Sequence, residues 1–276
     1  MTSLVGFLLA AHLVFGSMAA SSVEPTGAEG NTVEVNGIEM HYREQGSGRP
    51  LVLLHGFGGC GDNWQPFVAP LAEHYRLIIV DMRGHGHSTN PHKTFTHRQS
   101  AKDVFALLDS MDVGRFSAMG MSSGGMTLLH MATRQPDRIE SMVLISAAPR
   151  FNPQARSIMQ GASVENMPPK VGDLYRECAF RGEAQVAELV AQFRGFHADV
   201  EDMDFSASDL SRISATTLIV SGDRDVFVPV DVSSAMFQAI PNASLWIVPG
   251  GDHVPIYDPE LSFSAAALRF LEAPSR

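Results

Sequence analysis

Short runs of apolar residues alternate with longer amphipathic stretches over most of the chain. Six runs lack interleaved polar residues, as expected of parallel strands that are covered on both faces: 51–54, 77–80, 116–119, 142–146, 218–221 and 245–248. Helical periodicity lies between them, at 101–111, 123–135, 233–240 and 261–271. This alternation predicts an α/β fold with a doubly wound, mostly parallel sheet.

The pattern of apolar residues is different before the first of these runs. Residues 32–35 and 38–43 are strand-like and are joined by Asn36-Gly37, a pair that accepts positive φ at both turn positions. We therefore expect an antiparallel hairpin at one edge of the sheet.

No buried strand run occurs between residues 149 and 213. Residues 184–196 instead place Val186, Leu189, Val190 and Phe193 on one helical face. An interval of this length is too long for a plain loop. We expect a helical cap inserted at 149–213 into a core formed by 31–148 and 214–276.

The first 20 residues differ from the rest of the chain. An apolar run is followed by Ser17-Met18-Ala19, a small-x-small pattern, but no Lys or Arg precedes it, since the first is Arg43. This pattern predicts a cleaved signal peptide, with a secreted or periplasmic protein that has no stable membrane insertion. An uncleaved anchor, or a wrongly chosen start and a cytoplasmic protein, are the alternatives.

Composition narrows the classes of partner. With 45% apolar and 18% charged residues the chain is typical of a globular protein, and its net charge of −10 argues against nucleic acid and anionic membranes as partners. Two cysteines, Cys60 and Cys178, do not make a disulfide framework, and two free thiols are the favoured interpretation. In an oxidising compartment, a bond between them would staple the cap to the core.

A candidate nucleophile stands in the sequence Gly120-Met121-Ser122-Ser123-Gly124. This G-x-S-x-G pattern follows one predicted strand and opens a predicted helix, which is the context in which a sharp turn exposes a serine hydroxyl. The motif alone is moderately specific, and its placement makes Ser122 the predicted nucleophile. A structural serine in a glycine-rich turn is the alternative.

A serine hydroxyl needs a base, and the base needs an orienting acid. Asp225 and His253 follow the last two predicted strands, which makes His253 the candidate base and Asp225 the candidate orienting acid. The order Ser, Asp, His along the chain agrees with these roles. Asp223 is the rival acid because it lies closer to the strand end. Asp252 adjoins His253 in the chain, and a neighbour rarely folds back onto the next ring.

Other residues near the motif are candidates for binding. The glycine-rich segment after residues 51–54 predicts an oxyanion hole made by the backbone N–H groups of Phe57 and Ser123. Met121 and Trp64 are candidate substrate-contacting residues, although core packing is the favoured interpretation for Trp64 and an equal one for Met121.

Five ordered motifs resemble the signature series of the α/β-hydrolase superfamily. They are the segments 55–59, 81–88, 120–124 and 222–225, and His253. The resemblance implies Ser122 as nucleophile, His253 as base and Asp225 as orienting acid. A serine at the nucleophile position departs from the haloalkane dehalogenase and epoxide hydrolase branches, whereas similarity to esterases, enol-lactonases and cofactor-free perhydrolases remains.

Two segments resemble cofactor-binding motifs but lack a feature that each motif requires. Residues 56–61 fit G-x-G-x-x-G with Asp81 twenty residues on, but Pro66 would fall inside the helix that a dinucleotide site requires. His85-Gly86-His87 lacks the Asp-His pair of a hydrolytic metal motif. We therefore expect no cofactor and no metal.

The expected function is that of a serine hydrolase cleaving a small or medium carboxylic ester or lactone through an acyl-enzyme. A cofactor-free perhydrolase (haloperoxidase-like) or a C–C bond hydrolase would use the same three residues. A non-catalytic ligand receptor on the same fold is the alternative from another class.

Overall fold

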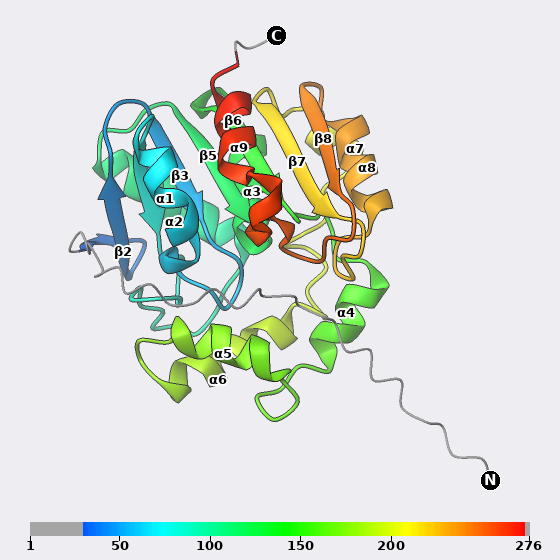
Figure 1. Cartoon of the computed structure of the whole chain (residues 1–276). Helices are drawn as coiled ribbons and strands as arrows, with labels where there is room; N and C mark the ends of the chain where they lie inside the picture. Colours follow the sequence, from blue (N-terminus) through cyan, green and yellow to red (C-terminus); the bar gives the residue numbers. More distant parts are fainter. Residues whose placement is uncertain (1–29, 274–276) are drawn as a thin grey trace.

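The computed structural model describes residues 30–273, which fold around one eight-stranded sheet (Figure 1). The strand order is β1-β2-β4-β3-β5-β6-β7-β8. The strands are β1 (Asn31–Val35), β2 (Ile38–Gln45), β3 (Pro50–Leu54), β4 (Arg76–Val80), β5 (Phe116–Met121), β6 (Ile139–Ile145), β7 (Thr216–Gly222) and β8 (Ala243–Val248). All six predicted buried runs form strands of this sheet.

The predicted hairpin forms one edge of the sheet. β1 and β2 are antiparallel, and β2 is also antiparallel to β4, whereas β4, β3, β5, β6, β7 and β8 pair in parallel. Asn36 and Gly37 join β1 to β2 with φ of 46° and 75°, the left-handed conformation that this pair tolerates. The predicted fold class is confirmed.

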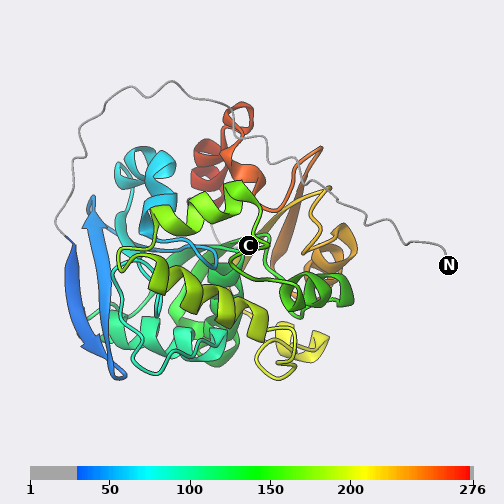
Figure 2. The same cartoon turned by 90° about the horizontal axis from the view of Figure 1, so that it is seen from below.

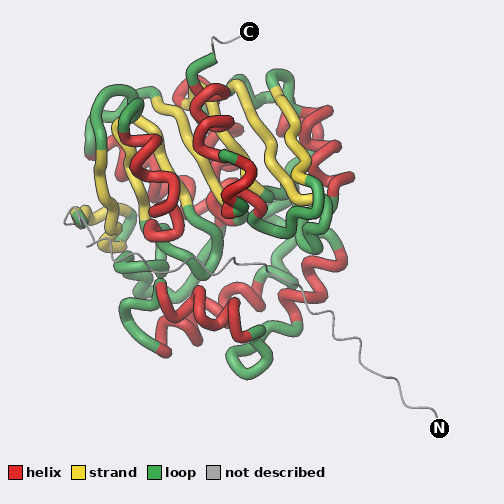
Figure 3. The backbone as a smooth tube through the Cα atoms, viewed as in Figure 1, coloured by secondary structure: helices red, strands yellow, loops and turns green. Residues whose placement is uncertain are grey.

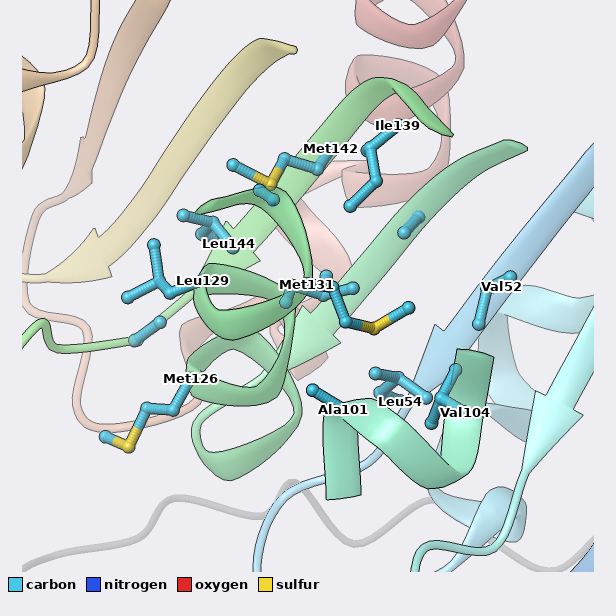
Figure 4. Packing of buried hydrophobic residues seen from close by; sticks show 14 of the residues in the cluster. Val52, Leu54, Ala101, Val104, Met126, Leu129, Met131, Ile139, Met142 and Leu144 are labelled. Atoms are coloured by element: carbon cyan, nitrogen blue, oxygen red, sulfur yellow. The ribbon is translucent and has the colours of Figure 1, made fainter. Parts of the chain in front are cut away.

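Helices cover both faces of the sheet (Figure 3). They are α1 (Gln65–Ala72), α2 (His97–Ser110), α3 (Ser123–Arg134), α8 (Val230–Ala239) and α9 (Phe263–Leu271), with 3-10 turns at Gly61–Trp64, Pro136–Arg138, Pro255–Tyr257 and Pro259–Leu261. Alternate residues of β3 serve different faces. Leu51 and Leu53 pack in the core that includes α1 and α9, while Val52 and Leu54 pack against α2 and α3 (Figure 4).

Four helices lie between β6 and β7: α4 (Pro153–Gln160), α5 (Pro169–Glu177), α6 (Glu183–Gly195) and α7 (Ala207–Leu210). Of these, α4, α5 and α6 lie together below the sheet, at the end toward which β7 points (Figures 1 and 2). A small separate core of Tyr175, Ala179, Val186, Leu189 and Val190 stabilises this inserted segment. The helix predicted at 184–196 corresponds to α6.

Some boundaries differ from those predicted. α2 begins at His97, four residues before the predicted start, because the Thr96 side chain accepts the Gln99 N–H and caps the helix. α1 was not predicted, since Pro66 and Pro70 obscure its pattern, although Pro66 occupies the first turn, where a missing N–H is tolerated.

The favoured interpretation of two free thiols is wrong. Cys60, which follows β3, forms a disulfide with Cys178, the residue after α5, across 118 residues of chain. Arg181 adds hydrogen bonds to the carbonyls of Ser88 and Gly84 at 2.7 and 3.0 Å. The Gln185 amide donates to the carbonyls of Gly84 and Gly86 at 3.0 and 2.9 Å. The inserted segment is therefore fixed to the core by one covalent and several polar contacts.

Within residues 30–273, no helix is both long enough and apolar enough to cross a membrane. The predicted signal peptide at residues 1–20 lies outside the described part of the chain.

Candidate active site

Ser122 lies in the sharp turn between β5 and α3. Its φ and ψ are 48° and −114°, a strained conformation for a residue with a side chain. Two glycines permit the turn. A Cβ on Gly120 would lie 2.5 Å from backbone atoms of Gly124 and Gly125, and one on Gly124 would lie 2.3 Å from the Leu54 carbonyl oxygen. The G-x-S-x-G spacing is thus required because the first turn of α3 packs directly on β5 and β3.

Three side chains that are distant in sequence form one hydrogen-bonded chain. Ser122 Oγ lies 3.0 Å from His253 Nε2, and His253 Nδ1 lies 2.9 Å from Asp225 Oδ2. Ser122 and His253 are partly accessible, while Asp225 is buried. Such an arrangement allows the imidazole to take a proton from the hydroxyl while the carboxylate fixes the ring.

Asp225, not Asp223, lies beside the histidine. Its second oxygen accepts the backbone N–H groups of Phe227 and Val228 at 2.8 and 3.0 Å. Burial raises the pKa of the Asp225 carboxyl, but the charge and hydrogen bond of His253 and the two N–H groups outweigh burial, so the net pKa is lowered. Asp223 instead accepts the Gly250 N–H at 2.7 Å and is exposed.

The two predicted oxyanion donors flank Ser122. In the described part of the chain, the backbone N–H groups of Phe57 and Ser123 have no hydrogen-bond partner. Ser123 is the first residue of α3, where the N–H groups of a helix have no internal acceptor. A Cβ on Gly56 would lie 3.6 Å from Ser122 Cβ, so the segment that carries Phe57 runs beside the serine. The assignment of these two amides as oxyanion donors stays a prediction.

Aromatic rings from separate elements gather around this site. Phe227 lies 5.0 Å from the His253 ring, and Phe193 of α6 lies 6.3 Å from Phe227 and 5.9 Å from Phe57, measured between ring centroids. All three phenyl rings are half-buried. Phe193 appeared in the sequence only as part of an apolar helix face, and Phe227 carried no signal, because their proximity depends on how the inserted segment lies on the sheet.

The prediction that Trp64 and Met121 contact the substrate is wrong. Trp64 is fully buried and packs against Phe67, and Met121 is buried in the same core cluster. Neither side chain offers a surface to a ligand. From the sequence, core packing was already the favoured interpretation for Trp64 and an equal one for Met121.

The structure also shows how the rejected cofactor motifs are used. In the glycine-rich segment, α1 begins only at Gln65, and the Asp81 carboxylate accepts the Gly61 N–H at 2.7 Å and binds His41 at 2.9 Å. Burial raises the pKa of Asp81, but the His41 hydrogen bond, His55 and two backbone N–H groups hold it at about 2. The ring of His87 stacks on Phe180 with 3.7 Å between centroids. Asp81 therefore supports loops of the core, and His87 contacts the inserted segment.

Comparisons with known proteins show which family this chain belongs to. The family model described as alpha/beta hydrolase fold matches residues 49–260, more than half of the chain. A candidate non-heme chloroperoxidase of Synechocystis sp. is 30% identical over 245 residues, covering 78% of this chain and 88% of that protein. A candidate carbamate hydrolase, RutD, of Pseudomonas syringae is 30% identical over 254 residues, covering 84% and 97%. The solved structure of an enol-lactonase from Burkholderia xenovorans is 27% identical, has a TM-score of 0.69, and aligns over 88% of this chain and 100% of that one.

Proposed function

Because the chain belongs to the α/β-hydrolase family, we propose that it is a serine hydrolase that cleaves a small or medium carboxylic ester or lactone through an acyl-enzyme. The observation that carries this proposal is the hydrogen-bonded chain from Ser122 through His253 to Asp225. The strained backbone of Ser122 adds support, since such strain is concentrated at functional positions.

The mechanism follows from the positions of these groups. His253 Nε2 accepts the Ser122 proton as Oγ attacks the substrate carbonyl, and Asp225 holds the imidazole in the tautomer whose Nε2 is free to accept. The Phe57 and Ser123 amides bind the oxygen that becomes negative. Loss of one such donor typically costs about 10²–10³ in kcat. His253 then protonates the leaving alcohol, and water releases the acid by the same steps.

The surroundings of Ser122 support an apolar acyl group. Phe57, Phe193 and Phe227 present half-buried rings near His253. In the described part of the chain, a disulfide and the side chains of Arg181 and Gln185 hold the inserted segment against the core. We expect this attachment to restrict the size of the acyl group. Both features favour compact esters and lactones over long or strongly charged ones.

Labelling with a fluorophosphonate, followed by peptide mapping, tests this function. We expect a single adduct on Ser122, and Ser122→Ala should lower kcat for a chromogenic ester by about 10⁴-fold or more. Ser146→Ala is the matched control, since Ser146 also follows a strand with positive φ of 49° and its buried hydroxyl has no partner in the described structure. A Ser122→Ala variant that keeps a tenth of the activity would contradict the proposal, and absence of any turnover or labelling would favour a ligand receptor.

A second reaction is favoured by one specific observation, the 30% identity to a protein named as a candidate non-heme chloroperoxidase. In that reaction hydrogen peroxide replaces water as acceptor of the acyl group, giving a peracid and free Ser122. Peracid-dependent halogenation in the presence of a carboxylic acid and peroxide measures it. The ratio of perhydrolysis to hydrolysis decides between the two activities. C–C bond hydrolysis on the same residues is tested with a vinylogous diketone acid.

The disulfide supports export of the protein. Disulfides persist mainly in oxidising compartments, so pairing of Cys60 with Cys178 agrees with the secreted or periplasmic location expected from residues 1–20. Cell fractionation with intact-mass measurement tests this: the exported form should lack the leader and carry no free thiol. A full-length cytoplasmic protein with two reactive thiols would overturn it.

A further inference from the structure

A second Ser–His–Asp chain lies directly behind the first. Ser123 Oγ is 3.0 Å from His97 Nε2, and His97 Nδ1 is 2.6 Å from Asp202 Oδ2. The three residues come from the start of α3, the start of α2 and the segment between α6 and α7. They are all buried, with exposed fractions of 4%, 0% and 6%. The proposed hydrolysis does not use the side chain of any of them.

The hydrogen bonds around Asp202 define the direction of this chain. Its carboxylate also accepts the backbone N–H groups of His97 and Arg98 at 2.7 and 3.0 Å. Burial raises the pKa of Asp202, but the bonds and charge of His97 and these N–H groups hold it at about 2, so the carboxylate is ionised and can only accept. Nδ1 of His97 therefore donates to Asp202, and Nε2 makes the hydrogen bond to the Ser123 hydroxyl.

The burial of these residues excludes a second active site. No part of His97 is accessible, and the rings of Phe95 and Phe196 lie 5.3 Å from it, centroid to centroid. A substrate carbonyl has no route to Ser123 Oγ. What Ser123 does offer to the site is its backbone N–H, which lies at the first position of α3 beside Ser122.

We propose that His97 and Asp202 are positioning residues that hold Ser123 so that its backbone N–H faces the developing oxyanion. This inference rests on the proposed function of Ser122. Because its hydroxyl is held by His97, the Ser123 side chain cannot rotate to bind the N–H groups of its own turn or the Ser122 hydroxyl. A small displacement of a hydrogen-bond donor also weakens its bond to a charged oxygen steeply.

The same chain connects the amide to the inserted segment. Asp202 lies three residues before Phe205, whose N–H donates to the Pro149 carbonyl at 3.0 Å where the segment leaves and rejoins the sheet. An Arg150–Asp204 bridge pairs the two ends at the same place. The position of the inserted segment on the sheet therefore determines where Asp202 lies. Through His97, Asp202 in turn fixes the first turn of α3.

Ser123→Ala is the direct test, because it keeps the backbone N–H and removes only the link. We expect kcat to fall about 10- to 100-fold, less than the 10²–10³-fold of a lost donor, with KM changed by less than threefold. Ser117→Ala is the matched control. It removes a buried hydroxyl that is 2.9 Å from Ser141 Oγ, in the strand that leads to Ser122, and should leave kcat within twofold.

The second arm is His97→Gln, alone and combined with Ser123→Ala. If His97 acts through Ser123, the double variant should be no slower than the slower single variant, because the link is already broken. Independent losses that multiply would contradict the proposal. If His97→Gln does not fold, Ser123→Ala alone decides.

The rate of fluorophosphonate labelling separates failure of this inference from failure of the proposed function. Wild-type protein that does not react at Ser122 would remove the basis of both proposals. Wild-type and Ser123→Ala proteins that react at equal rates, with equal kcat, would overturn the positioning role while leaving the serine hydrolase intact. Slower labelling of Ser123→Ala than of Ser117→Ala, at similar thermal stability, supports it.

Discussion

Loss of the disulfide between Cys60 and Cys178 should lower the free energy of unfolding of this protein. The bond joins the segment after β3 to the residue after α5, and its two cysteines are 118 positions apart in the sequence. Replacing both cysteines by serine removes the cross-link from the folded and the unfolded chain alike. Reduction of the native protein by dithiothreitol does the same without a mutation.

The loss comes mainly from the unfolded state, which regains the freedom of a long loop. In the chain-entropy model, closing a loop of this length costs the unfolded chain about 16 cal/mol/K, so the bond contributes about 5 kcal/mol at 25 °C. A domain typically has 5–15 kcal/mol in total. The folded state should change little, because the hydrogen bonds of Arg181 and Gln185 still hold the inserted segment.

Urea unfolding at neutral pH, followed by tryptophan fluorescence, measures the effect. With a slope of about 3 kcal/mol/M, the midpoint should fall by about 1.5–2 M in the double serine variant and in reduced wild type, whereas dithiothreitol should not alter the variant. Free thiols at Cys60 and Cys178 in wild-type protein prepared without a reductant, or equal midpoints for all samples, would refute the reasoning.

Three further predictions concern the site and its support. Asp225→Asn should lower kcat by about 10⁴-fold, because the amide favours the wrong imidazole tautomer. Asp223→Asn should change kcat by less than threefold. If Asp223→Asn has the larger effect in a steady-state ester assay, the acid is misassigned. Burial lowers the pKa of His130 to about 4, so between pH 6.5 and 4 the unfolded chain binds a proton that the native protein does not. The free energy of unfolding should therefore decrease as the pH is lowered, by about 2 kcal/mol from this group between pH 7 and pH 5. His130→Gln should reduce this pH dependence in urea titrations. Gly124→Ala should destabilise the fold by about 2 kcal/mol or more and abolish labelling, because the new Cβ would meet the Leu54 carbonyl oxygen at 2.3 Å; an unchanged unfolding midpoint argues against the tight turn.

The sequence by itself determined the features that depend on neighbouring residues. Apolar runs set the strands because a strand covered on both faces tolerates no polar alternation. The Asn36-Gly37 pair fixed the hairpin, since both residues accept positive φ. The spacing of Gly120, Ser122 and Gly124 marked the sharp turn, because only a missing Cβ fits where α3 approaches the strands. Each of these signals is contained within a few positions.

Only the tertiary structure decided which distant residues meet. The sequence favoured Asp225 over Asp223 as the orienting acid, but only the position of His253 decided between them. The cysteines paired because the inserted segment lies over the glycine-rich loop, and Trp64 turned inward under that loop. His97 and Asp202, 105 residues apart, had no sequence signal. Contacts of this kind depend on the strand order and on the position of the inserted segment on the sheet. The free energy that selects them is therefore spread over the whole core and is not encoded in any local pattern.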